Sequence, residues 1–272
     1  MIRAAHACLA AVLTCSTALA QTPGTDDAGN RITPLSAIAP VSDEQARTRS
    51  AIHCNAGRDL CLQAWREGES GPWFLDVHQR LPAGADVAPA SRIALPPGDD
   101  PDRETHTIWP HVIVESSGAL LFGVERYRTA GFSGGGGSMT HLTLLRRPAA
   151  AAAAAEVLTV QTGYTAMIRA CFTPDEYRNR GACHDEYELT GIVGLSPTAA
   201  SDRPRLTLAT TARSYPRGAR DDGNDSRRYR RADLVWEPDP SCSYRRTFAF
   251  DMASGRYLPD QPLPDCDTYT LS

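Results

Sequence analysis

Apolar and polar side chains alternate in short runs along most of the chain from residue 51 onward. The run Leu206–Thr211, with the sequence LTLATT, has this period of two. Such a period is typical of a β-strand with one buried face. The 20 Pro and 21 Gly residues fall mainly between the runs, where strand ends and turns require them. We predict strands over Trp73–Val77, His111–Glu115, Leu120–Arg126, Met139–Arg146, Val157–Thr162, Met167–Phe172, Tyr187–Leu195, Leu206–Arg213, Leu234–Glu237, Tyr244–Phe250 and Arg256–Leu258.

Few windows have the apolar stripe of a helix. One short helix is predicted at Thr173-Pro174-Asp175-Glu176, where an N-cap residue precedes a first-turn Pro and two acids. The predicted fold class is therefore all-β and antiparallel, with one short helix. Two architectures fit a compact region over 51–272. One is a β-sandwich or open barrel, and the other is a small β-propeller of about five blades of roughly 40–45 residues each.

The N-terminal 20 residues have the features of a secretory signal peptide. Arg3 precedes a short apolar run, and Ala18-Leu19-Ala20 has the small-x-small form of a signal peptidase site. Because the run is too short to span a bilayer, we predict cleavage after Ala20 and no transmembrane span after processing. The predicted location is periplasmic or secreted. A lipid anchor at Cys15 is disfavoured because Thr14 is large for the position before a lipidated cysteine.

Two segments of biased composition divide the rest of the chain. Residues 21–50 are rich in Thr, Pro, Ala, Ser and Asp and contain no aromatic side chain, so we predict a flexible tether there. The run Ala149–Ala155 is too short for an isolated helix. Residues 148–156 are therefore predicted as an Ala-rich linker between two halves of the compact β domain over 51–272.

The cysteine count indicates an oxidising compartment. Two of the eight Cys residues, Cys8 and Cys15, leave with the signal segment, and an even number remains. An even number in an exported chain indicates disulfides, and the C-x₂-C spacing of zinc modules is absent. Nearest-neighbour pairing predicts disulfides between Cys54 and Cys61, Cys171 and Cys183, and Cys242 and Cys266.

Composition excludes several kinds of chemistry. All 28 basic residues are Arg, and the 32 acidic residues give a net charge of −4. Without Lys, the chain has no Walker-type phosphate loop, no Schiff-base nucleophile and no pyridoxal phosphate anchor. The acidic balance argues against a general nucleic-acid binder. No cofactor is predicted.

Two loops are the candidates for binding. Segment 132–138 holds four glycines, which suit a flexible hairpin connection or the close approach of a backbone to an anion. Segment 227–231 is a basic patch with one aromatic residue, which suits an acidic protein, an anionic glycan, a membrane surface or a strand edge protected by charge. A protein partner ranks first. The predicted binding residues are Phe132, Ser133, Gly134, Ser138, Arg227, Arg228, Tyr229 and Arg230.

Three polar clusters are candidates for acid–base or metal chemistry. His106 and His111 follow an acidic segment that includes Asp99, Asp100 and Asp102. His184 and Glu186 converge if their segment is extended, because alternate residues of a strand face one side. Residues 221–225 have the alternating acids of a Ca²⁺ loop but lack its final Glu. An ordinary polar loop is favoured in each case, so no catalytic and no metal-binding residue is predicted.

The export segment, tether, β domain and local disulfides together resemble the plan of periplasmic lysozyme inhibitors and of immunity proteins against secreted muramidases. Some members are small β-propellers with an inhibitory Ser-Gly-x-x-Tyr loop. Here Ser70-Gly71-Pro72-Trp73 and Ser254-Gly255-Arg256-Tyr257 place the aromatic residue one position early. The resemblance therefore covers the plan of 51–272 and transfers no site residue. It implies a protein partner in the envelope and inhibition of a peptidoglycan hydrolase.

Three functions remain open at this point. The lack of a coherent catalytic set favours an exported, non-enzymatic β module that binds a protein partner and inhibits a peptidoglycan hydrolase. The first alternative is a secreted hydrolase of glycans or esters, because two carboxylates distant in sequence can be adjacent in space. The second alternative is a structural envelope protein.

Overall fold

The computed structural model describes residues 24–38, 42–80, 88–97, 103–150, 153–199, 203–219 and 228–271. Several sequence predictions fall outside these ranges. They are the signal segment 1–20 with Cys8 and Cys15, the acids of 99–102, the acidic loop 221–225, and Arg227.

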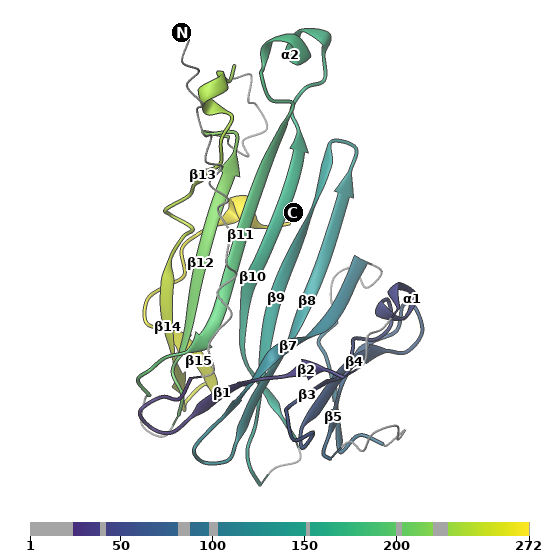
Figure 1. Cartoon of the computed structure of the whole chain (residues 1–272), viewed down its shortest axis with the longest axis vertical. Helices are drawn as coiled ribbons and strands as arrows, with labels where there is room; N and C mark the ends of the chain where they lie inside the picture. The colour runs from purple at the N-terminus through teal and green to yellow at the C-terminus, as the bar shows by residue number, and fades with distance from the viewer. Residues whose placement is uncertain are drawn as a thin grey trace, which may run out of the picture.

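Two antiparallel sheets form the molecule (Figure 1). The large sheet has ten strands in the order β1-β7-β8-β9-β10-β11-β12-β14-β15, with β13 also paired to β12. The small sheet has five strands in sequence order. The large-sheet strands are β1 (Arg31–Pro34), β7 (Glu104–Val114), β8 (Leu120–Phe132), β9 (Gly135–Arg147), β10 (Ala155–Arg169), β11 (His184–Leu195), β12 (Leu206–Tyr215), β13 (Glu237–Pro238), β14 (Arg245–Asp251) and β15 (Arg256–Pro259). The small-sheet strands are β2 (Ser36–Ala37), β3 (His53–Cys54), β4 (Cys61–Arg66), β5 (Trp73–His78) and β6 (Ser91–Ala94).

The antiparallel β class and the local disulfides are confirmed, and the helix count is corrected. Helix α2 (Pro174–Asn179) begins where the Thr173 N-cap and the first-turn Pro predict it. A second short helix, α1 (Asp43–Ala46), was not predicted. It is capped by Ser42, whose hydroxyl accepts the Gln45 N–H while the Gln45 side chain accepts the Ser42 N–H.

The middle of the large sheet is buried on both faces. On β8 the neighbours Leu121 and Phe122 point to opposite faces, and both are fully buried. Leu121 packs in a cluster that includes Phe248 of β14 and Tyr257 of β15. Phe122 packs in a second cluster with apolar side chains of the small sheet. Burial on both faces explains why Leu120-Leu121-Phe122 is a continuous apolar run rather than an alternating one.

The predicted tether over 21–50 is corrected for its described part. Strand β1 pairs with β7, with Ile32 opposite Ile113, and both side chains are buried. Leu35 is also buried, and its N–H donates to Pro110 O. Backbone pairing and these apolar side chains offset the ordering entropy that the average composition of the segment would leave uncompensated. The packed structure therefore begins before residue 51.

The Ala-rich segment is also corrected. It was predicted as a linker between two halves, but it joins β9 to β10, which are neighbours in one sheet. Ala155 already pairs with Arg146 across these strands. The two strands that flank the run belong to one sheet, so the run does not separate two halves.

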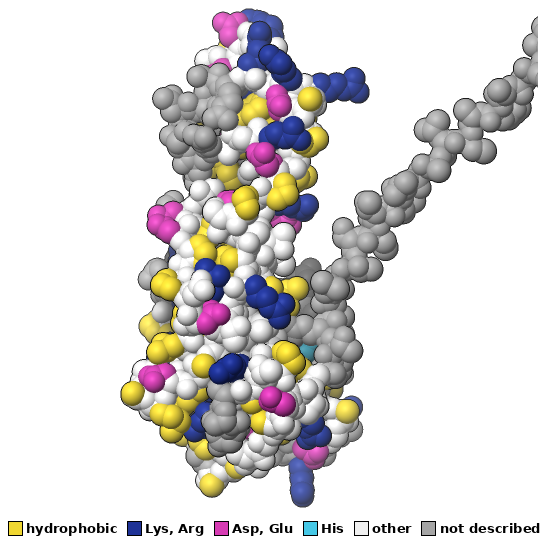
Figure 2. Space-filling view, turned by 90° about the vertical axis from the view of Figure 1, so that its left-hand side faces the viewer, with side chains coloured by type: hydrophobic (Ala, Val, Ile, Leu, Met, Phe, Trp, Pro, Cys, Tyr) yellow, Lys and Arg dark blue, Asp and Glu magenta, His cyan; other side chains and the backbone are white. Residues whose placement is uncertain are grey.

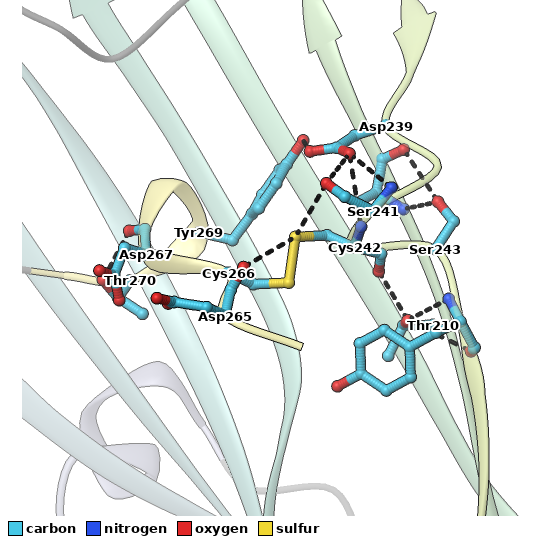
Figure 3. Close-up of a disulfide and its surroundings, with 12 residues drawn as sticks. Thr210, Asp239, Ser241, Cys242, Ser243, Asp265, Cys266, Asp267, Tyr269 and Thr270 are labelled. Carbon is cyan, nitrogen blue, oxygen red and sulfur yellow. Dashed lines mark hydrogen bonds between the residues drawn. A yellow bond between two sulfur atoms is a disulfide. The ribbon is translucent and has the colours of Figure 1, made fainter. Parts of the chain in front are cut away.

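The three nearest-neighbour disulfides are present as predicted. The Cys242–Cys266 bond fastens the C-terminal segment to the large sheet (Figure 3). Beside it, the fully buried Tyr269 donates its hydroxyl to Asp239 Oδ2 at 3.2 Å, and burial is the main cause that raises the Tyr269 pKa. Thr210 of β12 donates to Cys242 O at 2.7 Å. The segment after β15 therefore packs into the hydrophobic core against the large sheet.

Candidate functional site: the α2 loop

The Cys171–Cys183 loop projects beyond the ends of β10 and β11 and carries α2 (Figure 1). We call residues 171–183 the α2 loop. The Thr173 hydroxyl accepts the Glu176 N–H, and the Glu176 carboxylate accepts the N–H groups of Phe172 and Thr173, both at 2.7 Å. These backbone hydrogen bonds lower the pKa of Glu176, with the bond from Phe172 as the largest cause. The loop thus has a defined shape although its helix is short.

A buried ion pair anchors the α2 loop to the sheet. Arg180 donates from Nη2 to both Asp185 oxygens, at 2.9 and 2.8 Å, and the two side chains are only 3 and 7% exposed. Its Nη1 also donates to Ala182 O at 2.5 Å. The guanidinium lies 5.0 Å from the ring centroid of Tyr229. Arg180 therefore holds the end of α2, the start of β11 and the segment after residue 228 together.

The outer surface of this region exposes a group of large apolar side chains. Met167, Phe172 and Tyr177 are 54, 63 and 55% exposed. Between the two rings lies Arg169, with its guanidinium 5.1 Å from the Phe172 centroid and 6.0 Å from the Tyr177 centroid. Arg169 also donates to the Tyr177 hydroxyl at 2.9 Å and to Cys171 O at 2.8 Å. We call Met167, Arg169, Phe172 and Tyr177 the aromatic cluster; its rings are held in place while they face solvent.

The predicted glycine-rich segment lies next to this cluster. Phe132 pairs with Gly135, so Ser133 and Gly134 form a two-residue turn between β8 and β9. Gly134 O accepts the Arg169 N–H at 2.5 Å. Ser138 lies further along β9, where its hydroxyl bonds to Thr165 Oγ1 at 2.8 Å. The glycines after Gly134 belong to a strand that is paired on both sides, to β8 and to β10.

Gly135 is expected to be essential for this close pairing. Its φ is +151°, and a Cβ there would overlap Met167 O. Gly135→Ala is expected to lower the free energy of unfolding by roughly 1–3 kcal/mol, measured by urea denaturation. Gly131→Ala in β8 is the matched control, because a Cβ at Gly131 meets no atom within 4 Å. Equal stability of the two variants would contradict the requirement for glycine at Gly135.

The described part of the predicted basic patch, from Arg228 onward, contacts the α2 loop. Arg228 donates to Asn179 O at 3.0 Å and to Asn179 Oδ1 at 2.6 Å. The prediction of Tyr229 as a binding residue is wrong, because its side chain is buried against Arg180 and does not face solvent. The Arg230 N–H donates to Asp233 Oδ2 at the start of a 3-10 turn. The predicted basic segment therefore contacts the α2 loop, and the predicted glycine-rich segment contacts Arg169 of the adjoining aromatic cluster.

Two of the histidine candidates lie away from the α2 loop, whereas His184 starts β11 beside it and pairs with Arg169. His106 packs on Trp73 of the small sheet, and His111 lies beside Trp109, with centroid separations of 4.7 and 5.1 Å. His184 and Glu186 converge as their spacing predicts, with Nε2 2.9 Å from Oε1. Among the described residues, no three His, Cys, Asp or Glu side chains are grouped to hold a metal ion.

Sequence reasoning missed the aromatic cluster. The available signal was Phe172 and Tyr177 on either side of a predicted N-cap, inside a disulfide loop too small to bury them.

Comparison with protein-family models, curated proteins and solved structures gives no match for this chain. The geometry of the α2 loop is therefore the feature that points to a function.

Proposed function

We propose that this protein is an exported, non-enzymatic binding module that holds a protein partner at the α2 loop. The observation that carries the proposal is the aromatic cluster, in which Phe172 and Tyr177 are more than half exposed yet fixed by Arg169. Aromatic residues, Met and Arg are enriched in the energetically dominant parts of protein interfaces. A disulfide, a capping box and a buried ion pair hold the loop in shape before binding, which reduces the entropy cost of association.

Charge around the loop favours a partner with acidic groups. Dark blue Arg side chains gather at the end of the molecule that carries α2 (Figure 2). Exposed arginines of this region include Arg178, Arg217, Arg228, Arg230 and Arg231. Complementary charge raises the rate of association and rejects partners of like charge.

The partner class that we propose is a peptidoglycan hydrolase, which the module inhibits. A glycosidase cleft is concave and contains a pair of Asp or Glu side chains. A projecting loop with exposed rings and arginines is complementary to such a cleft in shape and charge. The three disulfides are compatible with an oxidising compartment. Within the described ranges, no helix is long and apolar enough to cross a membrane.

The test is inhibition of purified muramidases from several glycosidase families, measured as the clearing of a cell-wall suspension. The wild-type protein is expected to slow at least one of them. A double variant, Phe172→Ala with Tyr177→Ala, is expected to weaken that inhibition by on the order of 10²-fold. Met252→Ala is the control, because Met252 is also highly exposed but lies in the β14–β15 turn, at the opposite end of the large sheet.

Two results would overturn the proposal. One is the absence of both inhibition and direct binding for every muramidase tested. The other is inhibition that the double variant retains in full. Circular dichroism of the double variant separates loss of binding from loss of fold.

A further inference from the structure

A cavity of about 230 Å³ lies on the large-sheet face that the small sheet covers, away from the α2 loop. One wall is apolar and is formed by Leu95, Pro96 and Val124. The lining also has polar groups, among them His106 of β7 and Arg126 of β8. A concave site with an apolar wall and a few polar groups is the usual form of a small-molecule site.

The strand register builds the polar side of this cavity. Arg126 lies between His106 on β7 and His141 on β9. His106 is 5% exposed, and its Nδ1 has no hydrogen-bond partner among the described residues. A buried polar atom without a partner is costly, and a ligand that pairs with it removes that cost.

The charge at Arg126 is available to a ligand. The neighbouring guanidinium of Arg128 lies 3.8 Å from the buried Glu104 carboxylate. Within the described part of the chain, no carboxylate forms an ion pair with Arg126. The cavity does contain Glu156, but this carboxylate is held by Arg256 Nη2 at 2.5 Å and by the Thr159 hydroxyl at 3.1 Å.

Both histidines beside Arg126 are neutral at pH 7. Burial lowers the pKa of His106 to about 4, with Arg126 and Arg66 as further causes. Burial also lowers the pKa of His141 to about 4, with Arg126 and Arg128 as further causes. The cavity thus combines the cation of Arg126 with the neutral ring of His106, which suits a single negative charge.

We propose that this cavity binds a small organic carboxylate, with its charged end at Arg126 and His106 and a short apolar chain against Leu95 and Pro96. The apolar wall distinguishes this ligand from an inorganic anion. The cavity volume of about 230 Å³ restricts the ligand to a small molecule. This inference is independent of the proposed function at the α2 loop.

The test is titration of the full chain with sodium butanoate, followed by calorimetry and by amide NMR shifts. We expect saturable binding, with shifts grouped at His106, Arg126 and Thr143. Arg126→Gln is expected to weaken binding by about tenfold or more. Arg245→Gln, at an exposed arginine of β14, is the control and is expected to leave binding unchanged.

Three further probes define the ligand class. Butanamide has the chain without the charge, and sulfate has charge without the chain, so both are expected to bind at least about tenfold more weakly. N-acetyl-alanyl-alanine carries the carboxylate of a peptide C-terminus. If it binds more tightly than butanoate, the natural ligand is a peptide C-terminus rather than a free carboxylic acid. Failure of butanoate and of the dipeptide to bind the wild type overturns the proposal, as does equal binding of sulfate. If Arg126→Gln does not fold, the wild-type NMR map decides, and shifts outside the cavity overturn it.

Discussion

Arg180→Ala is expected to lower the free energy of unfolding by about 3–5 kcal/mol, the largest loss that we expect from one substitution. The substitution leaves the Asp185 carboxylate buried without its cation, since the two side chains are 3 and 7% exposed. It also removes the hydrogen bond to Ala182 O and the contact with the Tyr229 ring. Urea denaturation followed by fluorescence measures the loss.

Two comparisons isolate the role of burial. Arg178→Ala removes an ion pair with Asp175 in the same loop, but those side chains are 69 and 82% exposed, so we expect a change below about 0.5 kcal/mol. The double variant Arg180→Met with Asp185→Leu removes both charges and is expected to recover much of the loss. A loss in Arg180→Ala no greater than that in Arg178→Ala would show that the buried pair does not anchor the loop.

The same variant links stability to the proposed function. The aromatic cluster is unchanged in Arg180→Ala, but its loop loses the anchor to β11 and to Tyr229. We therefore expect muramidase inhibition to fall at a temperature where the rest of the sheet is still folded. Retained inhibition under those conditions would mean that the aromatic cluster acts without the ordered loop.

Features that depend on neighbouring residues were predictable from the sequence. The α2 start depends on Thr173, Pro174 and Glu176, which lie within one helical turn. The long strands follow from the period of two, and each disulfide joins cysteines that are neighbours in the sequence. Strand β1 was missed because Ile32 and Leu35 become strand and core residues only through contact with β7. The two strands are separated by about 80 residues of sequence, so no pattern within a short window predicts their pairing.

The candidate site was predictable only in part, for the same reason. The Gly134 turn and Arg228 were proposed as binding residues, and both are next to the α2 loop in the fold. Their positions depend on the contact of Gly134 with Arg169 and of Arg228 with Asn179, which are long-range contacts. Phe172 is exposed, whereas Tyr229 is buried under the Arg180 guanidinium, which is also a long-range contact. Both residues are aromatic, so residue type alone does not separate a surface ring from a packed one.

Lowering the pH from 7.5 to 4.5 is expected to destabilise the protein by several kcal/mol through His106 and His141. Both pKa values are about 4 in the folded protein, against an ordinary value of 6.5. Between these values the unfolded chain binds more protons than the folded chain. The stabilisation is therefore complete above pH 6.5 and is lost as the pH falls toward 4.

The size of this effect follows from the burial of His106. Each unit of difference in pKa corresponds to about 1.4 kcal/mol, so His106 contributes on the order of 3 kcal/mol at most. His141 is less buried and contributes less, because solvent screens its neighbours Arg126 and Arg128. Arg66 and Arg126 repel a proton on His106, and the Trp73 ring covers it.

His106→Phe keeps an aromatic ring against Trp73 and removes the titrating group, so it separates packing from protonation. Other contributions to acid destabilisation are common to wild type and variant and cancel in the comparison. The informative quantity is therefore the difference between the two proteins in the stability lost from pH 7.5 to 4.5. We expect the variant to lose about 2–3 kcal/mol less than wild type. Equal losses would mean that His106 keeps an ordinary pKa in the folded state and that solvent reaches the ring between the two sheets.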